Sequence, residues 1–467
     1  MDLLMRHQND KLDQKYHAMQ SNTSPRKSAA SPSPQSTNSR SGDKDSPYAA
    51  SDRLKIHRVS NIGLQVDSIT PAIIQPSSDV AIAFFVFNFN GGVYLDYLPR
   101  LYGAADRSSL LEASFEAVAI SYFSSRRRCP SLMRQAMERY SIALRETNHA
   151  VSTPKKAAQD DTVASVMLLA LFTALSCDAA EALPVWSKHV SAAMELMLLR
   201  VSRDSSSDTD QHLLSHIVSS VYLDCYAQRK ALPLSLSLLR RRSLLSTQFQ
   251  LQFWTVTDTL AGLRQDAIEG RLEDLDVLKQ ALILHRQARS LLEHLTRTHD
   301  IIAHAQGHIR ISCDYETHRR IQARNTLLMI LMDLNELLCV HGRRYVSMSP
   351  EYHALDRMWM ETQANRATKA YGEVVEEIYE SIPPFLKKGQ RQATPGTNTD
   401  MWICSFLWPF SKALESQGVL ATDLTDRIRR QLEHFAEVCD NRQLSKVIVQ
   451  LSESGTAPAH FHALYLC

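Results

Sequence analysis

The residues best suited to bind a metal ion in this 467-residue chain are its eight cysteines, and their spacing argues against a zinc site. They are Cys129, Cys177, Cys225, Cys313, Cys339, Cys404, Cys439 and Cys467. A structural zinc site encoded locally needs a Cys-x-x-Cys or Cys/His spacing, because one tight turn must deliver two ligands to a tetrahedral ion. Even the closest pair, Cys313 and Cys339, does not meet this requirement. The sequence therefore predicts no metal site, and free, mostly buried thiols in a reducing compartment.

A histidine pair offers a second candidate for metal chemistry. On a continuous helix, His304 and His308 would lie on one face at i and i+4, a spacing that can bind zinc. Gly307 stands between them and weakens the helix, so a polar loop is the favoured interpretation.

Paired carboxylates could support the chemistry of an α-helical isoprenoid synthase, which holds magnesium against a diphosphate with acidic residues one helical turn apart. Asp160-Asp161 lacks a third carboxylate one turn later. The segment Glu273-Asp274-x-Asp276 follows a Gly270-Arg271 break and is typical of an ordinary acidic helix start. An enzyme of this class is therefore a minor alternative.

Other catalytic signatures do not occur in the sequence. It contains no Gly-x-Gly-x-x-Gly fingerprint, no phosphate-binding loop with Gly-Lys-Ser/Thr, no Gly-x-Ser-x-Gly elbow and no His-Glu-x-x-His helix. We therefore predict no catalytic and no cofactor-binding residue. The one candidate modification site is Ser24, since Ser24-Pro25-Arg26-Lys27 fits proline-directed kinases and a phosphate could pair with the adjacent bases.

Composition indicates the kind of scaffold that carries these residues. Hydrophobic residues make up 44% of the chain, whereas only 14 glycines occur and aromatic residues reach 7%, which favours a helical protein with a sizeable core. The net charge of +2 argues against a body that neutralises many nucleic-acid phosphates. Met1–Gln20 has no apolar signal-peptide core, so export is not expected.

The chain divides by composition into four segments. Residues 1–50 are predicted to be a disordered tail and linker, since Ser21–Pro47 is rich in Ser, Pro, Thr, Asn and Lys. Residues 51–107 are expected to be loop-rich, with a buried apolar stretch at Ala81–Phe89 that forms either a short helix or an extended segment. Residues 108–455 are predicted to form one large all-α domain, followed by a C-terminal tail at 456–467.

Helix signals repeat along the large domain. Beyond two helices after Ser108 and Pro130, we predict helices over about 160–175, 183–199, 210–227, 247–266, 273–298, 318–341, 351–381, 398–416 and 421–451. The longest apolar run, Val163–Leu175, falls short of the roughly 20 residues that span a bilayer, so a buried helix is expected there and no membrane span.

Two further features invite a binding interpretation. Trp402, Phe406 and Trp408 could line an apolar ligand pocket, although core packing is the favoured role. Arg126-Arg127-Arg128 and Arg240-Arg241-Arg242 could contact nucleic acid, but neither has interleaved aromatic residues, and a solvated or partner-facing surface is favoured.

The order of several segments resembles the regulatory region, or middle homology region, of fungal zinc-cluster transcription factors. The resemblance runs from Phe84 to about Ser454. Its segments are Phe87–Pro99, Leu110-Leu111 through Ala119, Ala136-x-x-x-Tyr140-x-x-Ala143-Leu144, Asp161-Thr162-Val163 into Met167–Phe172, Trp186-Ser187-Lys188-His189 before Ala193–Met197, Trp402–Leu407 and Ile428–Ala436. Each is an ordinary amphipathic helix, and their order and spacing carry the resemblance.

The resemblance implies a nuclear transcriptional regulator with an all-α regulatory domain that senses a small-molecule effector or a protein partner, and it suggests control of a metabolic or secondary-metabolite gene set. The family's DNA-binding module has six cysteines that hold two zinc ions, whereas no cysteine precedes Cys129 here. DNA contact is therefore expected through a partner, as a homodimer or a heterodimer with a DNA-binding factor, unless an upstream cluster is missing from the gene sequence. A helical protein–protein adaptor unrelated to transcription is the main alternative.

Overall fold

The fold is built from helices throughout the part of the chain that the computed structural model describes. That part comprises residues 78–89, 95, 97–104, 108–127, 129–176, 179–200, 207–242, 248–305, 310–348, 354–387, 399–416, 420–439 and 442–455. These residues contain no strand, which confirms the all-α prediction for them. They all belong to the larger of two compact units, the one that contains Ser77–Cys467.

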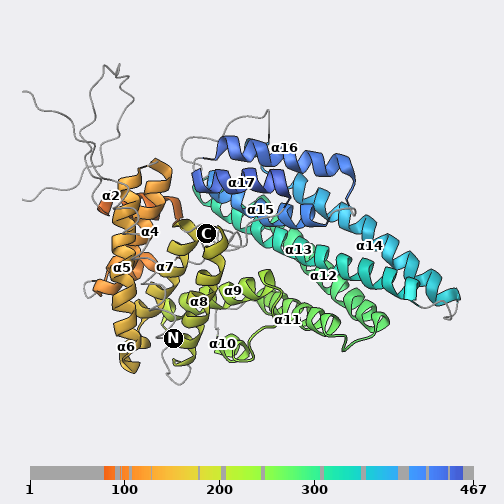
Figure 1. Cartoon of the computed structure of the whole chain (residues 1–467), viewed down its shortest axis with the longest axis horizontal. Coiled ribbons are helices and arrows are strands. Elements are labelled where there is room, and N and C mark those ends of the chain that lie inside the picture. The colour runs from red at the N-terminus through yellow and green to blue at the C-terminus, as the bar shows by residue number, and fades with distance from the viewer. Residues whose placement is uncertain are drawn as a thin grey trace, which may run out of the picture. The chain divides into compact units, whose positions relative to one another are not determined.

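The helices fall into two sequential groups (Figure 1). The first group contains α2 (Ser78–Phe89), α3 (Leu98–Tyr102), α4 (Ser109–Arg127), α5 (Pro130–Val151), α6 (Pro154–Ala157), α7 (Asp160–Ser176), α8 (Ala179–Leu198), α9 (Asp208–Ala227) and α10 (Leu236–Arg242). The second group contains α11 (Gln248–Ile268), α12 (Asp274–Ala305), α13 (Arg310–Met348), α14 (Ala354–Glu380), the 3-10 helix η1 (Pro384–Leu386), α15 (Thr399–Glu415), α16 (Thr422–Val438) and α17 (Arg442–Ser454).

Helix α7 is the core of the first group because it is apolar around its whole circumference. Every residue from Thr162 to Leu175 is buried. A helix of this kind must be surrounded by other helices, and α4, α5, α8 and α9 all pack against it. The apolar run Val163–Leu175 is thus a buried helix, as predicted. Among the helices that the structure describes, none has the length and apolar character needed to cross a membrane.

The apolar stretch near the start of the described chain is a helix, α2, and it packs against α4. Ala81, Ile82 and Phe85 are buried, and the Phe85 ring meets the Phe115 ring edge-on with centroids 5.7 Å apart. An extended segment would need hydrogen-bond partners from another strand. A helix satisfies its backbone internally, which explains why this β-prone sequence is helical here.

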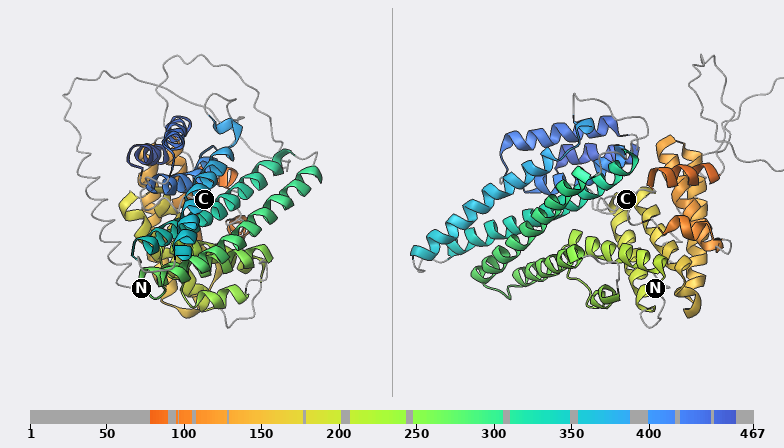
Figure 2. Two further views of the ribbon diagram at one scale, coloured as in Figure 1. Left: turned by 90° about the vertical axis from the view of Figure 1, so that its right-hand side faces the viewer. Right: turned by 180° about the vertical axis from the view of Figure 1, so that it is seen from behind.

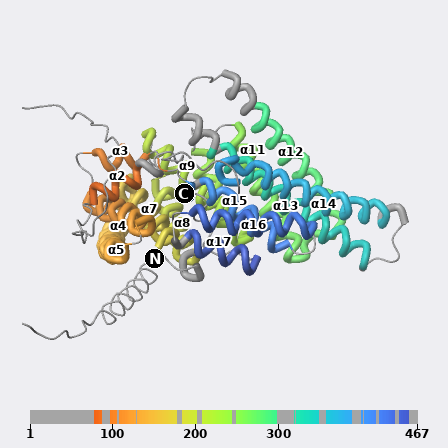
Figure 3. Tube along the Cα trace, turned by 90° about the horizontal axis from the view of Figure 1, so that it is seen from above, coloured from red at the N-terminus to blue at the C-terminus, as the bar shows by residue number. Residues whose placement is uncertain are grey.

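The second group consists of long helices that pack side by side. Helix α13 packs between α12 and α14, and α16 pairs with α17 alongside α15 (Figures 2 and 3). The aromatic side chains of α15 fill the space between these elements. Trp402, Phe406 and Trp408 are all buried, so their predicted role in core packing is confirmed.

Most long helices begin and end close to the predicted positions, but α12 runs seven residues past the predicted end, α13 extends beyond both predicted ends of 318–341, and one prediction is wrong in kind. The predicted helix 421–451 is two helices, because the chain leaves helical geometry at Cys439, which has φ −74° and ψ 123°. The short helices α3, α6 and α10 were not predicted. Helices of this length bury too few side chains to give an amphipathic pattern, although Pro99 and Pro154 mark the first turns of α3 and α6.

A close crossing of α13 and α14 depends on Gly342. A Cβ atom at this position would lie 3.1 Å from the Ala364 Cβ and 3.3 Å from the Met360 carbonyl oxygen. We expect Gly342→Ala to lower the free energy of unfolding by about 1–3 kcal/mol, since backbone atoms cannot move away as a flexible side chain can.

The matched control is Gly262→Ala in α11, where nothing lies within 4 Å of the added Cβ. It should raise the free energy of unfolding by roughly 0.5–1 kcal/mol, because alanine loses less backbone entropy in a helix. Urea unfolding followed by circular dichroism measures both. Equal effects of the two substitutions would contradict the close crossing.

Several sequence predictions lie outside the described residues. They are the disordered tail at 1–50 with its phosphorylation candidate Ser24, the C-terminal tail at 456–467, and His308 of the histidine pair. Within 51–107, the segment expected to be loop-rich, the described part contains α2 and α3.

Candidate functional site

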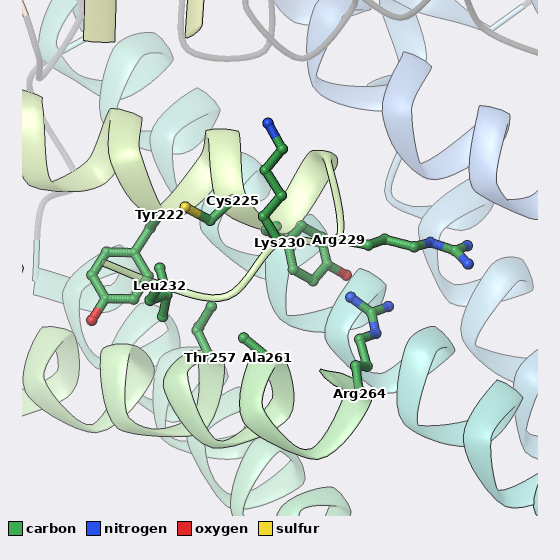
Figure 4. Close-up of a pocket in the computed structure, with 9 residues that line it drawn as sticks. Tyr222, Cys225, Arg229, Lys230, Leu232, Thr257, Ala261 and Arg264 are labelled. Atoms are coloured by element: carbon green, nitrogen blue, oxygen red, sulfur yellow. The ribbon is translucent and has the colours of Figure 1, made fainter. Parts of the chain in front are cut away.

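A pocket that opens to solvent lies where the end of α9 passes over α11 (Figure 4). Its free space of about 280 Å³ includes the open solvent at its mouth, and the enclosed part has room for about one water molecule. Three parts of the chain line it: Tyr222, Cys225 and Tyr226 from α9, Arg229, Lys230 and Leu232 from the following loop, and Thr257, Ala261 and Arg264 from α11. The contributions of α9 and α11 each follow helical spacing, so each helix presents one face to the pocket.

The loop begins with an unusual backbone at Arg229, the only non-glycine residue with positive φ among those described (φ 53°). The Lys230 amide donates to the Cys225 carbonyl over 2.9 Å, and the Arg229 amide donates to the Tyr226 carbonyl over 3.2 Å. These bonds end α9 in a left-handed turn that normally uses glycine. The turn places Arg229 and Lys230 at the rim of the pocket.

We expect Arg229→Gly to raise the free energy of unfolding by about 1 kcal/mol, since the left-handed backbone costs roughly that much for a residue with a Cβ atom. The comparison is Arg241→Gly on the exposed side of α10, where the same change in a helix should lower the free energy of unfolding by about 1 kcal/mol. Chemical denaturation of the two variants would reveal opposite signs. A loss of stability in Arg229→Gly would contradict a strained turn.

Beneath the pocket lies a buried ionic cluster, which we define as Tyr226, Arg264, Asp333 and Lys412. Asp333 on α13 is fully buried and forms ion pairs with Arg264 and Lys412, whose side chains are 11% and 9% exposed. Tyr226 donates its hydroxyl hydrogen to Asp333, and the Arg264 guanidinium lies over the Tyr226 ring at 5.2 Å from its centroid. The cluster joins α9 of the first group to α11, α13 and α15 of the second.

Burial alone would disfavour the charged form of Asp333. The nearby charges of Arg264 and Lys412 outweigh that cost and hold the pKa of the carboxyl below its ordinary value. Asp333 is therefore ionised at neutral pH, and it compensates two cations that have little access to water.

The pocket itself presents hydrogen-bond donors and no general base. Burial raises the pKa of the Cys225 thiol to about 12, and burial also raises the pKa of the Tyr222 and Tyr226 hydroxyls. These groups stay protonated at neutral pH, but the two hydroxyls already donate to Asp258 and Asp333, so the donors open to a ligand are those of the basic side chains. The arrangement can hold an acceptor or an anion, and it offers no group poised to take a proton.

The acidic residues that suggested magnesium chemistry have structural partners. Asp160 pairs with Arg200, and Asp161 accepts a hydrogen bond from the Ser108 amide over 2.9 Å. Asp274 lies 2.7 Å from Nδ1 of His341. No group of three or more His, Cys, Asp or Glu side chains within the described ranges could hold a metal ion. Cys129, Cys225, Cys339, Cys404 and Cys439 are free thiols.

Three arginines of the two runs, Arg126, Arg240 and Arg242, form ion pairs inside the molecule, so the interpretation as a solvated or partner-facing surface is wrong for these three. Arg126 pairs with Asp400 over 3.2 Å, and Arg127 lies over the Phe123 ring. Arg240 pairs with Asp258, and Arg242 lies 3.2 Å from Asp210, which also pairs with Arg200. Helix folding brings these arginines to acidic residues that are distant in sequence. Among the described members, Arg127 and Arg241 are exposed.

The sequence interpretation missed the pocket residues. A local signal did exist, since Tyr222, Cys225, Tyr226 and Arg229 follow one helix face and two basic residues come shortly before Pro233. Nothing in the sequence indicated that Arg264 would face them, because that contact depends on how α9 and α11 cross.

A comparison with known protein families finds a match that covers helices α4 to α11. Residues 108–268 match the family model described as "Fungal specific transcription factor domain". The match begins beside the start of α4 and ends with α11, so it includes every residue that lines the pocket. No similar curated protein and no similar solved structure was found. The resemblance inferred from the sequence is thus confirmed for this part of the chain, since residues 108–268 are similar to the fungal specific transcription factor domain.

Proposed function

We propose that this protein is a nuclear transcriptional regulator that works without catalysis, through ligand or partner binding to its helical domain. The family match to residues 108–268 is the observation that carries the proposal. The pocket lies within the matched residues, and its lining carries three basic side chains, which suits recognition of a ligand. The metabolic or secondary-metabolite gene set implied by the resemblance is part of the same proposal.

The mechanism we propose uses residues shared by the pocket and the buried ionic cluster. Tyr226 and Arg264 line the pocket and also contact Asp333 on α13. A ligand that binds more tightly to one arrangement of these side chains would shift the population toward it. Through Asp333 and Lys412 the shift would reach α13 and α15, which lie beyond the matched residues.

DNA contact is proposed to come from an associated subunit, either a second copy or another DNA-binding protein. The near balance of 52 basic and 50 acidic residues supports this, because a body that binds many phosphates usually carries a basic excess. In addition, Arg126, Arg240 and Arg242 of the two arginine runs already form ion pairs inside the molecule.

The test combines location with transcription in a fungus that encodes the protein. A fluorescent fusion should accumulate in nuclei, and deletion of the gene should change a limited set of transcripts that the restored gene returns to normal. A fusion confined to the cytoplasm together with unchanged transcripts would refute the proposal and favour the adaptor. Magnesium-dependent turnover of an isoprenyl diphosphate by the purified protein would instead revive the enzyme alternative.

A further inference from the structure

We propose that the pocket between α9 and α11 binds a small carboxylic acid through the guanidinium groups of Arg229 and Arg264. The inference deepens the proposed function, on which it relies for its biological role, by naming the chemical class of the effector. It is carried by the hydrogen-bond donors and the charges that converge on one open pocket.

Arg264 supplies the inner part of the site. Its side chain is only 11% exposed, and one of its nitrogen atoms, Nη2, pairs with Asp333. A guanidinium has five N–H donors. In the described part of the chain, Asp333 is the one acceptor that the Arg264 guanidinium contacts. Since Arg264 also lines the pocket, donors that Asp333 does not use are available to a ligand there.

Arg229 supplies the outer part. Within the described residues its guanidinium forms no ion pair, and the left-handed turn holds it at the pocket rim. Figure 4 shows Arg229 leaving the end of α9 on the same side of the pocket as Arg264, whereas Lys230 points away from α11. A strained backbone retained beside an open pocket is a recognised sign of function.

The charge of the lining is one-sided. Its nine residues include three cations and no carboxylate. The nearest acids have other partners, since Asp224 accepts hydrogen bonds from Ser187 and Gln228, and Asp333 is held by the buried ionic cluster. The positive charge of the lining therefore favours binding of an anion.

The shape and the walls favour a carboxylate on a small apolar body. Leu232, Ala261 and the protonated thiol of Cys225 offer apolar surface beside the two arginines. A planar carboxylate matches the fork of a guanidinium through two parallel hydrogen bonds. The pocket is small and opens to solvent, so it has room for the carboxylate group of an acid whose body stays at the mouth.

The first experiment titrates the purified full-length protein with benzoate and butyrate by calorimetry at constant ionic strength. Benzamide, the neutral counterpart of benzoate, and inorganic phosphate are the comparison probes. At least one of the two acids should bind saturably, and benzamide should bind at least tenfold more weakly. Absence of binding by both acids, equal binding of benzamide, or binding of phosphate alone would overturn the assignment.

The second experiment uses Arg229→Gly, which should keep or raise stability because glycine suits the turn. It should weaken binding of the acid about tenfold, as expected for the loss of one charge-assisted pair of hydrogen bonds. Arg241→Ala removes the same charge from an exposed position outside the pocket and should bind the acid as the unmodified protein does. Equal affinities of Arg229→Gly and Arg241→Ala would refute the site.

Failure of this inference can be separated from failure of the proposed function. Binding is measured on purified protein, whereas nuclear location and transcript changes are measured in cells with the gene present or deleted. A nuclear regulator whose purified form ignores both acids would leave the proposed function standing and remove the carboxylic-acid site.

Discussion

Replacing Asp333 with asparagine is expected to lower the free energy of unfolding by about 3–5 kcal/mol, because it removes one charge from a buried group and leaves its partners uncompensated. Arg264 and Lys412 have side chains that are 11% and 9% exposed, so water cannot replace the lost carboxylate. The Tyr226 hydroxyl would keep an acceptor in the asparagine carbonyl. The decrease in unfolding free energy therefore measures the effect of removing the charge, because the hydrogen bond is kept.

Glu336→Gln is the matched control for this prediction. Glu336 lies 3.5 Å from the same Lys412 ammonium, but its side chain is 37% exposed. Removing its charge should change the free energy of unfolding by less than about 1 kcal/mol, as is usual for surface ion pairs. Urea denaturation curves of both variants provide the comparison. Similar small losses in the two would show that Asp333 does not compensate buried cations.

Acidification from pH 7 to pH 5 is expected to destabilise the fold through two buried histidines. Burial lowers the pKa of His216 to about 3 and that of His189 to about 4. An unfolded histidine has a pKa of about 6.5, so below that pH the unfolded chain takes up protons that the folded protein excludes. The free energy of unfolding is therefore highest above pH 6.5 and decreases as the pH falls toward 4. At pH 5 each of the two histidines has lowered it by about 2 kcal/mol.

His216 offers the sharper test, because its Nδ1 atom lies 3.1 Å from the Tyr97 hydroxyl inside the first helix group. His216→Gln should reduce the difference in unfolding free energy between pH 7 and pH 5 by about 2 kcal/mol. His212→Gln, at a partly exposed position of the same helix, is the comparison and should change that difference much less. Because each variant is compared with the unmodified protein, carboxylates with raised pKa values cancel. A pH dependence unaltered by His216→Gln would show that this histidine is protonated in the fold.

The pocket adds a second expected effect of Asp333→Asn. Arg264 lies in the inner part of the pocket and forms an ion pair with Asp333. Asp333→Asn should therefore weaken the proposed ligand binding as well as lower the stability. Arg229→Gly separates the two effects, because it changes the rim and leaves the buried ionic cluster intact. Together the variants distinguish a binding defect from partial unfolding.

Local spacing in the sequence was sufficient to predict the long helices. The apolar run Val163–Leu175 indicated a helix buried on all sides, and Pro130 indicated the start of α5. The same local evidence excluded compact zinc and phosphate-binding motifs. It misjudged 421–451, because α16 and α17 have similar amphipathic patterns and the break between them spans only a few residues.

Which charged side chains meet was decided by tertiary structure alone. Nothing local distinguishes Asp333, which is fully buried between Arg264 and Lys412, from an acidic residue on a solvated helix face. Arg240 and Arg242 resembled a basic surface until folding brought them to Asp258 and Asp210. Helical periodicity is set within a few turns of chain, so sequence alone determines it well. Ion pairs and pockets between helices depend on crossing positions that are set by packing far along the chain, and only the folded structure determines them.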